Sequence, residues 1–346
     1  MSKQITFGLM ALLAAAGVPA AFGDVPLFAS QEPLEFRLEL PIRALRKADK
    51  ETWFLGKLSH AGTDFDVEFR ARGKFRLDLC RMPPLWVKFD KQQVKGTVFK
   101  GQRRLKLVPF CRDTDKYEEY VVLEYLVYRI YNLITPESYQ VRPAQVVYVE
   151  TKDGKATEPR FSVLLEHKRL LNKRLGFETI DVERIGPTDQ NPVTASLLEM
   201  FSFMIGNTDW SAIRGPEGEN CCHNVHLFAP KGAGVAEGTV VPVAYDFDQT
   251  GFVNPSYSEV NEDLGIRTVK TRLYRGWCRD PAFQEQTYAN FNAQRGAIEQ
   301  LVSSQPGLSE KTRAKAMKWV GGFYEVINDP KSRAKRIDKK CRGKRK

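Results

Sequence analysis

The stretch from Tyr117 to Ile134 constrains the fold of this chain more than any other, because its apolar residues fall on nearly every face of a helix. Asp113 or Thr114 can cap the start of this helix, and Pro136 stops it just after its last turn. A helix without a polar face has to be packed on more than one side. The sequence therefore predicts one long helix with neighbours on several sides.

Short β-type segments lie on either side of this helix in residues 24–166, separated by proline and glycine. They are Phe65–Arg70, Leu85–Phe89, Arg104–Val108, Val141–Val149 and Phe161–Leu165. Residues 167–330 favour helices, with starts at Pro192, at Pro281 and just after Ser309. Without the predicted signal and the C-terminal segment, about 300 residues remain, and the chain is 42% hydrophobic. This is enough for a substantial core, most simply arranged in two lobes. We predict an α+β fold with a strand-rich N-lobe that contains the long helix and a mostly helical C-lobe.

The first 23 residues are typical of a secretory signal, since Lys3 precedes an apolar run and a small-residue ending stands before Asp24. We expect this segment to be cleaved and the mature chain to be exported, either to a periplasm or as a secreted protein. A membrane anchor is the alternative, but the apolar run of 14 residues is shorter than the roughly 20 that a bilayer requires. The mature chain is therefore not expected to span a membrane.

All six cysteines would then lie in an oxidising compartment, where an even count favours disulfides over a metal cluster. The chain has no Cys-x-x-Cys spacing, which argues further against zinc. We predict a bridge from Cys80 to Cys111. Cys221 and Cys222 are adjacent, and a bridge between neighbours closes a strained ring, so at least one is expected to reach a distant partner such as Cys278.

The formal charge of +11 is concentrated at the C-terminus, where residues 331–346 contain ten lysines and arginines against one aspartate. Residues 24–330 carry a net charge of about +1. The body of the protein is thus nearly neutral, and no specific nucleic-acid binding is predicted. The C-terminal segment lacks apolar periodicity, so we expect a disordered basic tail that binds anionic surfaces or only keeps the chain soluble.

The residues that can carry chemistry gather between positions 205 and 254, in loops that flank two short apolar strands. They are Asn207, Asp209, Asn224, Asp246 and Asp248. Gly206 is a suitable residue to end the preceding helix, so the loop with Asp209 begins at a rigid element. Oxygen ligands at strand ends suit a hard divalent cation and a phosphate chain. A structural Ca²⁺ site and a simple Asx turn at Asn207 are the alternatives.

Glu124 lies in the middle of the long helix, where a carboxylate needs a partner because burying it unpaired is costly. Lys106, on the strand just upstream, can supply the opposite charge. A local contact with Arg129 or Tyr128 is an equal alternative.

Three short motifs in the same region resemble the exported CotH-type kinases and, more distantly, the HipA-type kinases. They are Gly206 to Trp210 (Gly-Asn-Thr-Asp-Trp), the pair His223-Asn224, and Tyr245 to Asp248 (Tyr-Asp-Phe-Asp). Arg72-Gly73, residues 85–89 and residues 161–166 are also similar to the CotH pattern, so the resemblance covers about residues 65–255. It implies a protein-kinase-like bilobal fold with Mg²⁺ and ATP as cofactors.

By this resemblance, Asp209 is the catalytic-loop carboxylate that orients or deprotonates an acceptor hydroxyl. Asn224 and Asp246 hold Mg²⁺ on the nucleotide phosphates, and Asp248 is the candidate for a second metal ligand. These assignments make the loops around the two short strands the catalytic and metal-binding part of the molecule.

The same resemblance assigns the groups that bind the nucleotide. Lys106, held by Glu124, is the first candidate to neutralise the α- and β-phosphates, and Lys88 is the second. Glu166 directly follows an apolar strand, where a hinge would meet the adenine. Arg72 is placed to contact phosphate.

The chain departs from the usual kinase pattern around Asp209. Asp209 and Asn224 stand 15 residues apart with two cysteines between them, which is wider than the usual catalytic loop, so this loop must fold back. The two histidines that flank Asn224 are assigned no catalytic role. A basic run from Arg267 to Arg275 suits an acidic substrate, or it forms a solvated face.

The predicted function is that of an exported atypical kinase. It would transfer a phosphoryl group, or alternatively a nucleotidyl group, from Mg-ATP to a hydroxyl of a protein substrate in the envelope or outside the cell. Two alternatives stay open at this point. One is a catalytically inactive kinase-like surface-binding protein, and the other is a metal-dependent hydrolase that uses the aspartates without a nucleotide.

Overall fold

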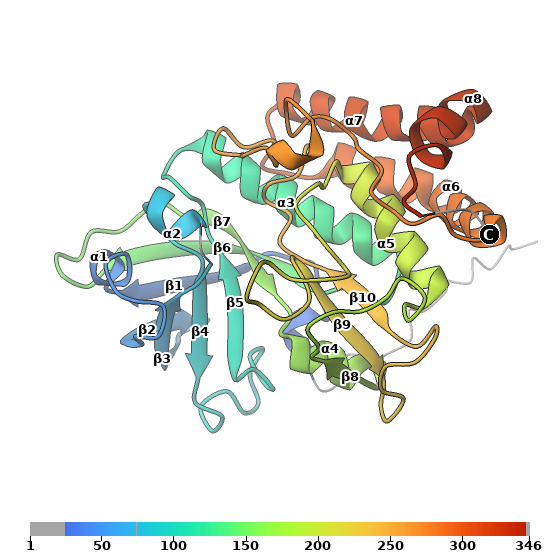
Figure 1. The fold of residues 1–346 in the computed structure, drawn as a ribbon. Coiled ribbons are helices and arrows are strands. Elements are labelled where there is room, and N and C mark those ends of the chain that lie inside the picture. The colour runs from blue at the N-terminus through green and yellow to red at the C-terminus, as the bar shows by residue number, and fades with distance from the viewer. Residues whose placement is uncertain (1–24, 74, 344–346) are drawn as a thin grey trace, which may run out of the picture.

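The computed structural model describes residues 25–73 and 75–343 (Figure 1). The predicted signal, residues 1–23, lies outside the described residues. A β-barrel and a group of helices lie side by side, and the long helix α3 (Asp115–Ile134) lies where they meet. A small sheet is placed at the foot of the helical part.

Seven strands close into the barrel in the order β1-β2-β3-β4-β5-β7-β6. They are β1 (Leu34–Leu40), β2 (Phe54–His60), β3 (Thr63–Ala71), β4 (Leu85–Phe89), β5 (Arg104–Val108), β6 (Val141–Glu150) and β7 (Arg160–Leu165). Neighbouring strands are antiparallel except β1 and β6, which pair in parallel along the whole of β1. Alternate residues of the strands are buried, so the interior of the barrel is a hydrophobic core.

The predicted protein-kinase-like bilobal fold is wrong, because the strands form a closed barrel and not the sheet of a kinase N-lobe. The difference comes from β1 and β2, because no strand was predicted before Phe65. β1 alternates buried and more exposed residues, and it pairs with β2 on one edge and with β6 on the other. This second pairing removes the open edges that a sheet would otherwise present to solvent.

Two short helices, α1 (Ile42–Leu45) and α2 (Phe75–Leu79), lie beside the barrel strands. The remaining helices are α4 (Lys168–Leu175), α5 (Pro192–Ile205), α6 (Pro281–Ser304), α7 (Glu310–Asn328) and α8 (Pro330–Arg333). The small sheet contains β8 (Phe177–Ile180), β9 (Val225–Pro230) and β10 (Val241–Ala244), in the antiparallel order β10-β9-β8. None of the helices in residues 25–73 and 75–343 is both long and apolar enough to cross a membrane.

The prediction that the long helix is packed on more than one side is confirmed. α3 contacts β6 and β7 of the barrel and also α5 and α6 of the helical part. Its residues from Val121 to Leu126 are buried without interruption, including Glu124. The helix therefore joins the barrel to the helical part through a shared core.

The cysteines form three bridges, which place the chain in an oxidising, exported environment. The predicted pair of Cys80 and Cys111 is confirmed. The expectation of a distant partner for Cys221 or Cys222 is wrong, since these neighbours are joined to each other. Cys278 bonds instead to Cys341, because the backbone of the last residues pairs with the segment around it.

The expected disordered tail is helical through much of its described length, which ends at residue 343. Helix α8 leads into one π-helical turn, Ala334–Asp338, in which Ile337 is fully buried. The guanidinium of Arg336 lies over the ring of Phe203 at 5.8 Å. This apolar anchor and the bridge from Cys341 hold the segment on the helical part, so composition alone was a poor guide here.

Candidate functional site

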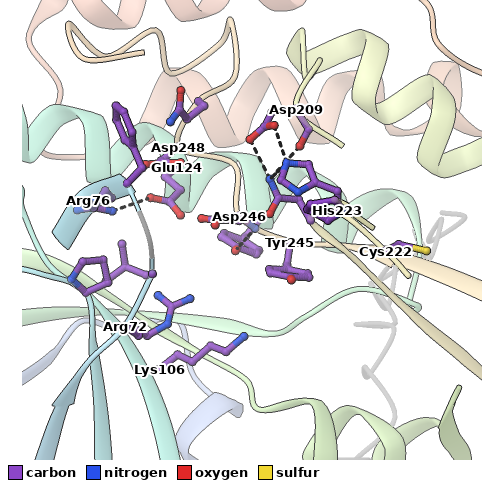
Figure 2. Close-up of a pocket in the computed structure, with 18 of the residues that line it drawn as sticks. Arg72, Arg76, Lys106, Glu124, Asp209, Cys222, His223, Tyr245, Asp246 and Asp248 are labelled. Atoms are coloured by element: carbon purple, nitrogen blue, oxygen red, sulfur yellow. Dashed lines mark hydrogen bonds and ion pairs between the residues drawn. The ribbon is translucent and has the colours of Figure 1, made fainter. Parts of the chain in front are cut away.

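A cavity of about 410 Å³ lies between the barrel and the helical part (Figure 2). It is lined by most of the polar residues that the sequence analysis singled out, which are Arg72, Lys106, Glu124, Asp209, Asn224, Asp246 and Asp248. Arg72 and Lys106 reach into it from the barrel, and the carboxylates face them from the other side. We call this cavity the cleft.

The end of helix α5 fixes the first carboxylate of the cleft. Gly206 ends the helix in the left-handed conformation, with φ 65°, as predicted for its C-terminus. A side chain at this position would also meet the Trp319 ring, since a Cβ would lie 2.8 Å from it. The side-chain Oδ1 of Asn207 accepts a hydrogen bond from the backbone N–H of Asp209 at 3.0 Å. The Asx turn that was the alternative for this segment is therefore present. The turn aims Asp209 into the cleft.

The hairpin of β9 and β10 places two more ligand candidates together. Val225 pairs with Ala244, so Asn224 and Asp246 lie at the same end of the hairpin. Asn224 and Asp246 both adopt positive φ, 53° and 64°, which non-glycine residues rarely do. The backbone N–H of Asp246 donates to the Tyr128 hydroxyl at 3.0 Å, which ties this conformation to α3. Such backbone conformations cost about 1–3 kcal/mol each and concentrate at functional sites.

Asp209 is held by two neighbours that come from 14 and 15 residues further along the chain. His223 Nε2 lies 2.6 Å from one carboxylate oxygen, and the Asn224 amide donates to the other at 3.0 Å. The long loop folds back because Ser211 and His223 pair through their backbones. The hydrogen bond to Asp209 raises the pKa of His223, although burial opposes this shift. The carboxylate of Asp209 thus favours the protonated form of His223.

Two further carboxylates lie buried at the inner end of the cleft. Glu124 is 3% exposed, and its partner is Arg76 at 3.8 Å, so neither Lys106 nor the local contacts expected from the sequence pair with it. Burial raises the pKa of Glu124, and the charge of Asp248 adds to this effect and outweighs Arg76. Burial also raises the pKa of Asp248, with a further contribution from Asp246. At this end of the cleft, burial and the neighbouring carboxylates therefore favour the protonated forms of Glu124 and Asp248.

Lys106 provides the opposite charge from strand β5. Its side chain is 8% exposed and is surrounded by the rings of Trp86, Tyr139 and Tyr245, with the ammonium 5.0–5.9 Å from their centroids. Burial lowers the pKa of Lys106 to about 7, and the nearby Arg72 adds to the shift. The Lys106 ammonium thus becomes more stable when a bound anion enters the cleft.

Two residues assigned to the site by sequence lie outside the lining of the cleft. Lys88 forms an ion pair with Glu68 at 2.6 Å on the outer part of the barrel, so it is not the lysine of this cleft. Glu166 is 3% exposed and accepts from Arg174 and from the backbone N–H of Gln140. Its carboxylate is fully engaged in holding the segment after β7, and this engagement argues against a contact with adenine.

The donor groups of the cleft fit a hard cation that arrives together with a phosphate. Among the described residues, no group of three His, Cys, Asp or Glu side chains is gathered closely enough to hold a metal ion by itself. Mg²⁺ is usually held by one or two carboxylates together with substrate phosphates. Asp246 and Asp248 supply carboxylates, and the Asn224 amide nitrogen donates to Asp209, which leaves its oxygen for a cation. This donor set suits Mg²⁺ better than a closed structural Ca²⁺ site.

Two residues that line the cleft were not predicted from the sequence. His223 was assigned no role, yet it bonds directly to Asp209. Its position next to Asn224 was the available signal. Arg76 on α2 was not singled out, and it lies against Glu124 because the bridge between Cys80 and Cys111 fixes α2 beside the end of β5. The predicted bridge was the signal that could have drawn attention to it.

No family model matches this chain, and no curated protein matches it in sequence.

Proposed function

We propose that this protein is an exported enzyme that transfers a phosphoryl group from Mg-ATP to a hydroxyl of a protein substrate, in a periplasm or outside the cell. The observation that carries the proposal is the pairing of opposite charges across the cleft. Arg72 and Lys106 come from the barrel, and Asn224, Asp246 and Asp248 come from the loops of the hairpin. Function is carried by a site and not by a fold, so the barrel leaves this argument intact.

The nucleotide phosphates would lie between the two sets of charges. Arg72 and Lys106 would neutralise phosphate oxygens, while Asn224 and Asp246 would hold Mg²⁺, and Asp248 is the candidate for a second metal ligand. When bound, Mg²⁺ supplies charge neutralisation of the transferring group. The raised pKa values of Glu124 and Asp248 support this arrangement, because a cation nearby would relieve their mutual repulsion.

Asp209 is the residue that acts on the acceptor. The bond from the γ-phosphorus to the β,γ-bridging oxygen breaks, and a bond to the acceptor oxygen forms. The acceptor's proton passes to the Asp209 carboxylate, which the hydrogen bonds from His223 and Asn224 hold in place. The motifs around these residues resemble those of the CotH-type kinases, which supports the same chemistry.

Thermal unfolding of the mature protein tests nucleotide binding. We expect Mg-ATP to raise the melting temperature of the wild type, and Asp246→Ala and Lys106→Met to abolish the rise. Lys88→Met is the matched control, because this lysine lies outside the cleft and its loss should leave the rise unchanged. Stabilisation by Ca²⁺ alone, without any effect of nucleotide, would support a structural ion site instead.

Labelled ATP tests the transfer itself. With a general acceptor such as casein, label at the γ-phosphate should reach the protein, and label at the α-phosphate should not. Asp209→Asn should lose transfer and keep the thermal stabilisation by Mg-ATP. Transfer of the α-label would identify a nucleotidyl transferase, and binding without any transfer would identify an inactive surface protein. Release of inorganic phosphate from simple esters without nucleotide would point to a hydrolase.

A further inference from the structure

A second cavity, of about 970 Å³, lies between the start of α3, the start of α7 and the segment 251–256. Six cationic side chains line it, which are Lys116, Lys270, Arg272, Lys311, Lys315 and Lys318. We call it the basic groove. It is separate from the cleft in its lining residues, and none of the site residues described above belongs to it.

The positive charge of the basic groove is not balanced within the described part of the chain. Glu119 is the acidic residue of its lining, and its oxygens are taken by the backbone N–H of Ser309 at 2.5 Å and by the Thr312 hydroxyl at 2.7 Å. Among the described residues, none of the five lysines of the groove takes part in an ion pair. The groove therefore offers several free charges to an anionic ligand.

The interior of the groove is partly apolar. Leu123 and Phe252 contribute to the lining. The Arg272 guanidinium lies over the Trp319 ring, 4.2 Å from the ring centroid. The indole N–H of Trp319 donates to the Met204 carbonyl, which fixes the ring. A concave surface with apolar residues inside and lysines at its margin fits an extended peptide with acidic residues around an apolar one.

One segment of chain connects the basic groove with the cleft. Gln249 lines the cleft, and Gly251, two residues later, lines the groove. Tyr257, at the end of this segment, packs against Phe75 of the cleft lining at 6.3 Å between ring centroids. A peptide held in the groove would thus have its neighbouring residues close to the cleft.

We propose that the basic groove binds an acidic segment of the protein substrate and presents the adjoining residues to the cleft. That the bound segment belongs to a substrate rests on the proposed function. Binding of an acidic peptide to the groove does not depend on it. The groove gives a role to Lys270 and Arg272, the part of the predicted basic run that lines it.

Fluorescence anisotropy with a labelled Glu-rich peptide that contains one leucine tests the binding step, without nucleotide and at low salt. The variant Lys311→Glu/Lys315→Glu/Lys318→Glu reverses three charges on one face of α7. We expect it to bind the peptide about tenfold or more weakly than the wild type. The introduced glutamates carry the same charge as the peptide, and like charges at an interface are strongly unfavourable. Added salt should weaken wild-type binding.

The matched control makes the same change of charge elsewhere, as Lys91→Glu/Lys95→Glu/Lys100→Glu, at three exposed lysines of the barrel. It should bind the peptide like the wild type. Equal binding by the α7 variant and the wild type overturns the proposal, as does equal weakening in both variants. Groove-dependent binding of phosphatidylglycerol vesicles or of polyuridylate, without binding of the peptide, would also overturn it.

The transfer reaction separates this proposal from the proposed function. With an acidic acceptor protein, the α7 variant should raise KM and leave kcat unchanged, because the cleft is intact. Asp246→Ala should lose transfer and still bind the peptide. If the wild type transfers nothing but the peptide binds in the groove, the proposed function fails and the groove assignment stands.

Discussion

The substitution Lys106→Met removes the buried ammonium of the cleft and keeps the side chain similar in volume. Lys106 is 8% exposed, and burial lowers its pKa from 10.5 to about 7. The folded protein then binds fewer protons than the unfolded chain between these two pH values, so its stability rises as the pH increases from about 7 to 10.5. Below this range, the lysine costs its full amount of stability.

The pKa shift gives the size of the effect. At pH 7 the free energy of unfolding is lower by about 4 kcal/mol than it would be with a neutral side chain. Contacts of the ammonium with three aromatic rings offset part of this cost, at roughly 0.5–1 kcal/mol each. We therefore expect Lys106→Met to raise the free energy of unfolding at pH 7 by about 2 kcal/mol. The gain should fade as the pH approaches 10.

Urea unfolding of the wild type and the variant at pH 7 and pH 10, with the disulfides intact, measures this difference. The comparison at each pH removes the effects of groups that titrate in both proteins. A variant that is less stable than the wild type at pH 7 would refute the reasoning, as would a gain that does not change with pH. A stable variant that no longer responds to Mg-ATP would show that the cleft sacrifices stability for binding.

Three further predictions concern other parts of the molecule. Asp209→Asn should lower the pKa of His223 in an NMR titration, because Asp209 raises this pKa. The stability that the His223–Asp209 contact contributes is full below about pH 6.5 and is lost as the pH rises through the pKa of His223 in the folded protein. Asp248→Asn should stabilise the nucleotide-free protein in urea at pH 8 but not at pH 4, since a raised pKa makes the charged carboxylate costly only above its ordinary value of 3.8. Removal of the Cys80–Cys111 bridge, which closes a loop across 31 positions, should lower the free energy of unfolding by about 3–4 kcal/mol, and a double alanine variant that unfolds at the wild-type urea midpoint would contradict this.

The helices and loops of the cleft were predictable because their signals are local. The apolar faces of α3, the proline at the start of α5 and the glycine at its end each specify an element within a few residues. The order of the segments then suggested that Asp209, Asn224 and Asp246 belong together. The hairpin register brings Asn224 and Asp246 to the same end of the hairpin, and the backbone pairing of the long loop brings Asp209 to them.

The closed barrel was not predictable in the same way. Its closure depends on the parallel pairing of β1 with β6, whose residues lie more than 100 positions apart in the chain. No local pattern reports such a pairing. The partner of Glu124 was missed for a similar reason, because Arg76 reaches it only through the position that the Cys80–Cys111 bridge gives to α2.

The central claim is that the cleft binds a nucleotide together with a divalent cation, and a calorimetric titration with ATP tests it most directly. We predict that ATP binds to the wild type in the presence of Mg²⁺, that binding is lost when the cation is chelated, and that Asp246→Ala and Lys106→Met each abolish it. Absence of binding with Mg²⁺, or equal binding with and without the cation, would contradict the claim.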